Sequence, residues 1–285
     1  MNDPMYSEAR QPARALTIAG SDSGGGAGIQ ADLKTFQELG VYGMSALTAI
    51  TAQNTLGVHG VFPLDKEAVS MQIHAIGSDI GVDALKTGML FSAELIETVA
   101  EAISYFGWTN VVVDPVMIAK GGASLLQEDA VAAMTRKLLP LTAVLTPNLP
   151  EAEKLSGVAI RSYEDKQEAA RRLAGFGAKY VIIKGGHDEG EEAVDLLFDG
   201  AHFSELSGKR VATARTHGTG CTYSAALTAG LAKGLSVHAA MTEAKAFIQA
   251  AIEDGITIGG GHGPTNHWAY RRSQASSVTP AAFRT

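Results

Sequence analysis

The chain contains a single cysteine, Cys221, among its 285 residues. One thiol excludes a disulfide within the chain and a zinc site of the Cys-x-x-Cys type, so we expect a reducing, cytoplasmic location. No apolar run reaches the roughly 18 residues that a membrane-spanning helix needs. The first fourteen residues also lack the apolar core of a secretory signal. These absences predict a protein with no membrane partner.

The chain also has no run of lysine and arginine. Its 23 basic residues are outnumbered by 30 acidic ones, and the net charge is −7. Nucleic-acid binding needs a basic stripe, so we exclude nucleic acid as the main partner and expect a small metabolite. Because 46% of the residues are apolar and only 19% are charged, the chain can bury a sizeable core.

Short β-rich runs alternate with longer segments at helical period, which is typical of a parallel sheet covered by helices on both faces. We therefore predict an α/β protein with a mostly parallel central sheet. The predicted strands are 15–19, 45–52, 84–87, 110–113, 143–146 and 180–184. The predicted helices are 28–39, 66–76, 93–106, 127–138, 149–156, 163–176, 219–232 and 237–252.

The segment after residue 194 follows a different pattern. Two short β-rich runs, 196–198 and 202–206, flank an Asp-Gly pair, which predicts a hairpin and thus an antiparallel edge on the sheet. No linker or internal repeat is visible. We predict one domain over residues 14–264, with 1–13 and 265–285 as flexible ends.

A glycine-rich segment, 20–28, follows the first strand and opens a helix. Parallel sheets bind ligands at the carboxyl ends of their strands, so this segment is a candidate binding loop. It does not fit G-x-G-x-x-G, because a start at Gly24 would need glycine where Ile29 stands, and the chain has no P-loop motif. Asp32, one turn further along the helix, is expected to face the same crevice. The alternative is an ordinary turn without a ligand.

A second glycine turn, Thr216-His217-Gly218-Thr219-Gly220-Cys221, comes directly before the apolar helix 219–232. Glycines at a helix N-terminus leave backbone N–H groups free, and the helix dipole adds positive potential, so the turn predicts an anion site. The same setting predicts a lowered pKa for the Cys221 thiol. The alternative is a buried structural cysteine.

Asn148 and Glu151 lie three residues apart where a helix is predicted to start. Their oxygens could hold a water-coordinated Mg²⁺, or they could form a capping box with no ligand. Both interpretations stay open.

Two further charged groups follow predicted strands: Asp114 after 110–113, and Lys184 at the end of 180–184. Such positions are where phosphate, metal and substrate would be met. His187 and His217 are expected to be hydrogen-bonded loop histidines rather than metal ligands, because no second ligand stands at metal-binding spacing.

Together these segments resemble the hydroxymethylpyrimidine kinase/phosphomethylpyrimidine kinase family of thiamin biosynthesis, within the ribokinase-like superfamily. The resemblance extends from residue 15 to residue 264. The motifs that carry it are 25–34, 51–55, 86–90, 114–117, 146–152, 184–187 and 217–222. It implies a ribokinase-like fold, ATP and Mg²⁺ as cofactors, and a homodimer, and it leaves open whether a monovalent cation is needed.

The activity that the resemblance implies is ATP-dependent phosphorylation of 4-amino-5-hydroxymethyl-2-methylpyrimidine to its monophosphate, and then to the diphosphate. Asp32 and Gln53 would hold the aminopyrimidine, while Gly20, Thr51 and Met89 would shape its pocket. A carboxylate and a carboxamide suit the donor and acceptor edge of that ring.

The same resemblance assigns the phosphoryl-transfer groups. Cys221 would stand where sugar kinases of the superfamily have an aspartate and would activate the hydroxymethyl oxygen. The amides of Gly218, Thr219, Gly220 and Cys221 would receive the phosphoryl group. Lys184 and Thr216 would lie near the nucleotide phosphates, and Asp114, Asn148 and Glu151 would serve Mg²⁺ and its waters.

Two alternatives remain. A pyridoxal or pyridoxine kinase shares the fold, although Met89 and Gln53 favour the pyrimidine. A non-catalytic pyrimidine-binding or regulatory protein is the remoter one, because a sensor has no need of Cys221, Lys184 and the other phosphoryl-transfer residues.

Overall fold

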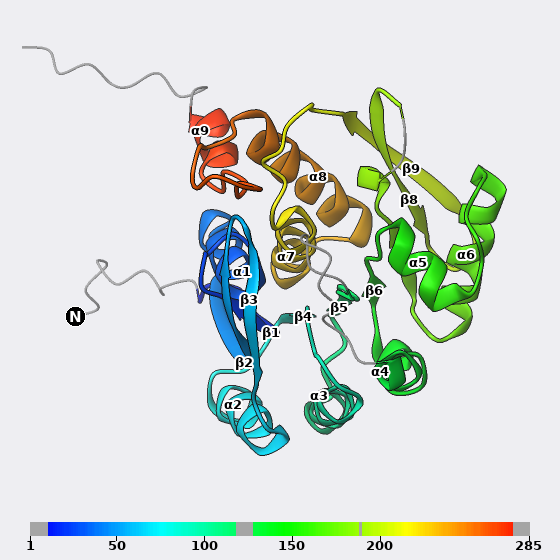
Figure 1. The fold of residues 1–285 in the computed structure, drawn as a ribbon. Helices are drawn as coiled ribbons and strands as arrows, with labels where there is room; N and C mark the ends of the chain where they lie inside the picture. Colours follow the sequence, from blue (N-terminus) through cyan, green and yellow to red (C-terminus); the bar gives the residue numbers. More distant parts are fainter. Residues whose placement is uncertain (1–10, 118–127, 188–189, 276–285) are drawn as a thin grey trace, which may run out of the picture.

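The computed structural model describes residues 11–117, 128–187 and 190–275 (Figure 1). These residues form one nine-stranded sheet in the order β3-β2-β1-β4-β5-β6-β7-β8-β9. Its strands are β1 Arg14–Asp22, β2 Tyr42–Asn54, β3 Gly57–Pro63, β4 Ala84–Thr87, β5 Val111–Val113, β6 Val144–Leu145, β7 Tyr180–Ile183, β8 Glu192–Phe198 and β9 Phe203–Lys209. The six strands from β2 to β7 in this order pair in parallel.

Both edges of the sheet are antiparallel. The hairpin β8–β9 pairs Phe198 with Phe203 across a turn that contains Gly200 at φ 95°, and it continues the sheet beyond β7. The predicted fold class, including the antiparallel hairpin, is confirmed. At the other edge β3 pairs with β2. This strand was not predicted, because its sequence carries two glycines and a proline and its side chains are half-buried or exposed.

Helices cover both faces of the sheet (Figure 1). They are α1 Gly28–Glu38, α2 Lys66–Asp79, α3 Ala93–Phe106, α4 Glu128–Ala133, α5 Leu149–Ser156, α6 Tyr163–Gly175, α7 Thr219–Ala232, α8 Val237–Glu253 and α9 Ala269–Ala275. The three valines of β5 show how the layers form. Val111 and Val113 pack with α3, whereas Val112 packs with α7 and α8 on the other face, so the strand is apolar throughout.

Helix α7 is the most deeply buried element at the site. It lies between the sheet and α8 and is buried from Thr222 to Leu231. Its approach to α8 is close, since a Cβ at Gly230 would lie 2.7 Å from Cβ of Ala240. A helix packed on several sides reads as apolar all round, and the position of its first turn is fixed by this packing.

The predicted domain end at residue 264 is wrong for residues 265–275. Thr265, Asn266 and His267 are buried, and the Asn266 amide donates to the backbone oxygen of Asp254 at 2.8 Å. His267 Nε2 lies 3.0 Å from Oγ1 of Thr222 in α7. The segment is polar in sequence, and the side chains of Asn266 and His267 are paired, whereas the buried Thr265 hydroxyl has no partner among the described residues. Helix α9 follows it. Residues 1–10 and 276–285, predicted as flexible, lie outside the described residues.

The predicted helix 127–138 is observed as α4, followed by a π-helical turn at Met134–Leu138. Among the described residues no helix has both the length and the apolar character needed to cross a bilayer.

Candidate active site

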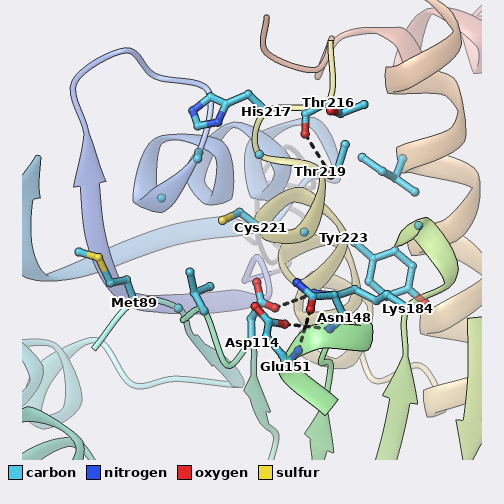
Figure 2. A pocket seen from close by; sticks show the side chains of 18 of the residues that line it. Met89, Asp114, Asn148, Glu151, Lys184, Thr216, His217, Thr219, Cys221 and Tyr223 are labelled. Carbon is cyan, nitrogen blue, oxygen red and sulfur yellow. Dashed lines mark hydrogen bonds and ion pairs between the residues drawn. The ribbon is translucent and has the colours of Figure 1, made fainter. Parts of the chain in front are cut away.

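A cavity of about 640 Å³ opens at the carboxyl ends of the parallel strands (Figure 2), the position that this sheet topology favours for a ligand. Gly20, Thr51, Gln53 and Met89 line one end of it. The other end reaches α8, and the N-terminus of α7 with Cys221 lies between the two (Figure 2). Two ligands could therefore meet at Cys221.

The first end of the cavity is narrow and partly apolar. A Cβ at Gly20 would collide with the terminal methyl group of Met89, so a side chain at position 20 would displace Met89 from its present place in the cavity wall. Thr51 is buried, and its hydroxyl donates to the backbone oxygen of Ser21 at 2.9 Å. The structure thus brings these predicted pocket residues together with Gln53.

Asp32 does not lie among the lining residues. It is fully buried, its Oδ1 lies 2.9 Å from Nζ of Lys86, and its Oδ2 accepts from the Thr17 hydroxyl at 2.6 Å. Both oxygens are engaged behind the cavity wall, so this geometry does not support direct binding of a pyrimidine by Asp32. Lys86 lines the cavity instead. Burial lowers the pKa of Lys86, but the charges of Asp32, Cys221 and Asp114 and the hydrogen bond to Asp32 together hold it above its ordinary value.

The predicted anion turn is built at the start of α7. Gly218 has φ 81°, and a Cβ there would overlap the backbone oxygen of Gly26. The Thr219 amide and hydroxyl both contact the Thr216 oxygen. The amides of Gly220 and Cys221 have no hydrogen-bond partner among the described residues and lie at the cavity. Two free N–H groups at a helix N-terminus form an anion-binding site.

The Cys221 thiol is half-buried, and the nearby Gly28 amide acts to lower its pKa. Burial raises its pKa to about 11, and the nearby carboxylates of Asp32 and Asp114 add to this, while Lys86 acts in the opposite direction. The predicted lowering of this pKa is therefore wrong. The sequence places the thiol at a helix N-terminus, but it does not show that the thiol is shielded from water and lies close to two carboxylates.

Asp114 and Lys184 form an ion pair in the middle of the cavity. Nζ of Lys184 lies 2.7 Å from Oδ1 of Asp114, and the Ser224 hydroxyl donates to Oδ2 at 3.2 Å. Burial alone would raise the pKa of Asp114, but Lys184 and Lys86 hold it below its usual range. A Cβ at Gly220 would lie 3.4 Å from Nζ of Lys184, so the ammonium faces the anion turn.

Asn148 and Glu151 form the capping box that the sequence left open. Asn148 Oδ1 accepts from the Glu151 amide at 2.9 Å, and a Glu151 oxygen accepts from the Asn148 amide at 2.8 Å. Burial raises the pKa of Glu151 to about 7, against the attraction of Lys184, and the charge of Asp114 contributes.

No group of three His, Cys, Asp or Glu side chains in the described part of the chain could hold a metal ion. The oxygens of Asn148 and Glu151 that form the capping box are already engaged. The proximity of Glu151 to Asp114 is nonetheless a like-charge contact that a dication would relieve. This donor set fits a Mg²⁺ held through water, because Mg²⁺ keeps several waters and uses few protein oxygens.

The far end of the cavity contains residues that were not predicted. Nζ of Lys245 lies 2.8 Å from Oδ2 of Asp195, and the Gly185 amide donates to Oδ1 of the same carboxylate. Ile248 and Ile252 add apolar surface there. The spacing of Lys245, Ile248 and Ile252 places them on one face of a helix, but nothing in the sequence indicates that this face lines a cavity.

His217 is a hydrogen-bonded loop histidine, as predicted. Its Nε2 lies 2.9 Å from Oδ2 of Asp22 and 3.1 Å from the side-chain nitrogen of Gln53. The side chain of His187 lies outside the described part of the structure.

Comparisons with known proteins agree with this geometry. The family model described as phosphomethylpyrimidine kinase matches residues 22–266. A hydroxymethylpyrimidine/phosphomethylpyrimidine kinase of Bacillus subtilis is 56% identical over 265 residues, which cover 93% of this chain and 98% of the relative. A pyridoxine kinase of the same organism is 49% identical, with 92% and 98% covered. The structure of Staphylococcus aureus pyridoxal kinase in complex with AMP-PCP and pyridoxal has a TM-score of 0.85 and 43% identity, and the similarity covers 92% of this chain and 96% of that one.

Proposed function

The chain belongs to the phosphomethylpyrimidine kinase family, and from this premise we propose that it phosphorylates 4-amino-5-hydroxymethyl-2-methylpyrimidine and then the resulting monophosphate, as in thiamin biosynthesis. It is an ATP-dependent phosphotransferase. The observation that carries the proposal is the pair of free amides at Gly220 and Cys221, which face Lys184 inside one cavity.

Phosphoryl transfer has a loose transition state, so a protein catalyses it mainly by position and positive potential. The Gly220 and Cys221 amides would hold the oxygens of the migrating group, and the dipole of α7 adds to their potential. Lys184 would contact phosphate oxygens from the nucleotide side, and Thr216, which lines the same cavity in the turn before α7 (Figure 2), would lie near these phosphates.

Cys221 is neutral at pH 7, because its pKa is about 11. The thiol would then orient the hydroxymethyl oxygen of the substrate by a hydrogen bond. As the new O–P bond forms and the bond from phosphorus to the ADP oxygen breaks, the hydroxyl proton would stay on the attacking oxygen and pass late to an oxygen of the transferred phosphoryl group. A late proton loss suits a loose transition state, in which the attacking oxygen carries little positive charge.

Mg²⁺ would be held on the same side, through water, by Asp114, Asn148 and Glu151. The ion would supply charge neutralisation on the phosphate oxygens. Ionisation of Glu151, whose pKa is about 7, would accompany its binding, since a dication favours the carboxylate.

The pyrimidine would occupy the end lined by Gly20, Thr51, Gln53 and Met89. For the second phosphorylation the monophosphate would have to leave and rebind with its phosphate as the acceptor, because one anion turn serves both steps.

Pyridoxal or pyridoxine is the second candidate substrate, because a pyridoxine kinase is 49% identical to the chain. The identity is higher, 56%, for the pyrimidine kinase over a similar length. The pyrimidine is therefore the better supported substrate.

A homodimer is the assembly that we propose. Strand β3 is an edge strand, and Ile50, Leu56 and Phe62 on the β2–β3 hairpin are 47%, 73% and 62% exposed. Apolar side chains gathered at a sheet edge favour an interface. Light scattering at several concentrations tests this, and a cytoplasmic location stays a prediction.

The function is tested with purified protein, Mg-ATP and one acceptor at a time: hydroxymethylpyrimidine, its monophosphate, or pyridoxal. ADP release and the mass of the product are followed. We expect mono- and diphosphate from the pyrimidine at a higher kcat/KM than any pyridoxal phosphate. Pyridoxal as the better acceptor would reassign the substrate, and no turnover with any of the three would refute the kinase.

A further inference from the structure

His217 lies where three elements of the site meet (Figure 2). Its Nε2 is 2.9 Å from Oδ2 of Asp22 in β1 and 3.1 Å from the side-chain nitrogen of Gln53 in β2. The backbone amide of His217 donates to the oxygen of Gly263. One ring nitrogen thus contacts both the glycine loop and a residue that lines the substrate end of the cavity.

The charge of Asp22 determines whether Nε2 of His217 carries a proton. Its carboxylate accepts hydrogen bonds from the amides of Gly24 at 2.8 Å, Gly26 at 3.0 Å and Ala27 at 2.8 Å. These donors favour the charged form of Asp22. A lone pair on Nε2 would face that carboxylate at hydrogen-bond distance, so Nε2 carries the proton and donates to Oδ2.

With Nε2 protonated, two contacts of the Gln53 carboxamide are unfavourable in its present orientation. Its nitrogen faces Nε2–H of His217, which sets donor against donor. Its oxygen lies 3.3 Å from Oγ1 of Thr51, and the single proton of that hydroxyl already goes to Ser21 at 2.9 Å. A half-turn of the carboxamide removes both conflicts. The one Nε2–H is then shared, in a three-centre hydrogen bond, between Oδ2 of Asp22 at 2.9 Å and the Gln53 oxygen, and the Gln53 nitrogen faces a lone pair of Thr51.

We propose that His217 is a positioning residue that fixes the carboxamide of Gln53 with its oxygen toward Nε2 and its nitrogen toward Thr51, where Thr51 and Gln53 both line the cavity. One amide hydrogen is then used by Thr51. The other is free, and Gln53 lines the substrate end of the cavity. The free amide hydrogen of Gln53 is therefore a hydrogen-bond donor inside the substrate end of the cavity. It selects a substrate whose ring nitrogen at this place carries no proton and can accept the hydrogen bond.

This inference rests on the proposed function, because it concerns how the same site recognises its ring. A pyrimidine presents unprotonated ring nitrogens, which suits a fixed donor. A ring with N–H at that place would meet donor against donor, and a ring with C–H would leave the Gln53 donor unpaired. His217 touches neither the substrate nor the phosphate in this scheme and acts only through Gln53.

The first test uses a double-mutant cycle. H217Q places a side-chain amide near the position of Nε2 and keeps a donor, whereas H217L removes it. We expect H217L to raise the pyrimidine KM about tenfold with the ATP KM changed less than threefold, and H217Q to restore most of the affinity. H238L, at an exposed histidine of α8, is the matched control and should match the wild type.

Coupling to Gln53 separates a positioning role from a purely structural one. Q53A alone should raise the pyrimidine KM more than the ATP KM, and H217L added to Q53A should raise it less than twofold further. Losses that multiply in the double mutant would overturn the inference, because His217 would then act through Asp22 and the glycine loop alone.

A second measurement needs no variant at position 217. A pyridine analogue with CH in place of the ring nitrogen that faces Gln53 is titrated calorimetrically into wild type and Q53A. We expect about tenfold weaker binding than the pyrimidine to the wild type and no such difference with Q53A. Equal binding of both ligands to the wild type refutes the inference while the kinase function stands. A wild type that does not phosphorylate the pyrimidine refutes both.

Discussion

Alkylation of Cys221 measures the electrostatics of the site directly, because the chain has no other cysteine. With a pKa of about 11, about one thiol in 10⁴ is ionised at pH 7, roughly 100-fold fewer than for a thiol whose pKa is 9.0. A thiolate of higher pKa is intrinsically more reactive, by about tenfold for two pKa units. The expected rate with iodoacetamide at pH 7 is therefore about a tenth of that of a model thiol.

The dependence on pH is the sharper observable. The rate should rise about tenfold per pH unit between pH 7 and 9.5 and show no plateau there. Intact-protein mass spectrometry counts a single added label, and C221A serves as the blank. A plateau below about pH 8.5 would show that the helix N-terminus and Lys86 outweigh burial, and our account of the thiol would be refuted.

Three further predictions concern the phosphoryl-transfer side. C221A should lower kcat more than tenfold and leave the pyrimidine KM nearly unchanged, as expected when a transition-state contact is lost; unchanged turnover would remove Cys221 from the mechanism. K184M leaves Asp114 buried without its partner and should lower the free energy of unfolding by about 3 kcal/mol in urea titrations, and adding D114N should restore most of it. Because the pKa of Glu151 is raised to about 7, the folded state keeps a proton that the unfolded chain loses from about pH 4.5. The free energy of unfolding of the wild type should therefore fall by up to about 3 kcal/mol between pH 5 and 8, relative to that of E151Q. Unfolding free energies that follow parallel pH profiles in the two proteins would contradict this.

Helix bounds were predicted well where local capping chemistry marks them. Helix α3 begins after Ser92, whose side chain accepts from the Leu95 amide, and ends at Gly107 with φ 66°. Helix α5 has the same kind of ends, Asn148 and Gly157. These signals are contained in the sequence itself, and both helices have the predicted bounds.

Long-range packing was not predictable in the same way. The ion pair of Asp32 with Lys86 joins α1 to β4 behind the cavity wall, and no spacing in the sequence reveals that both oxygens of Asp32 are taken. The pKa of Cys221 depends on the same buried environment. Residues 265–267 look like a polar tail because their partners, among them Thr222 and Asp254, lie in other elements.

The glycine turn at the start of α7 could be predicted from sequence because its conformation is local, and its anion binding stays a prediction. Its fit against the glycine loop could not be predicted. Gly218 must be glycine both for its φ of 81° and for the oxygen of Gly26. The first requirement is visible in a glycine-rich motif, whereas the second depends on how α1 and α7 pack.

The contact between Gly26 and Gly218 joins backbone from near the two ends of the chain. A ribosome that has translated only the first half of the message has made the loop around Gly26 and all the parallel strands up to β5, but not the turn that would bind phosphate. If the turn binds phosphate as we propose, the nascent chain cannot consume nucleotide, and turnover begins only when residues 216–221 emerge and dock. Two separately expressed halves, cut between β6 and β7, would each be inert for the same reason and would regain turnover only on reassociation.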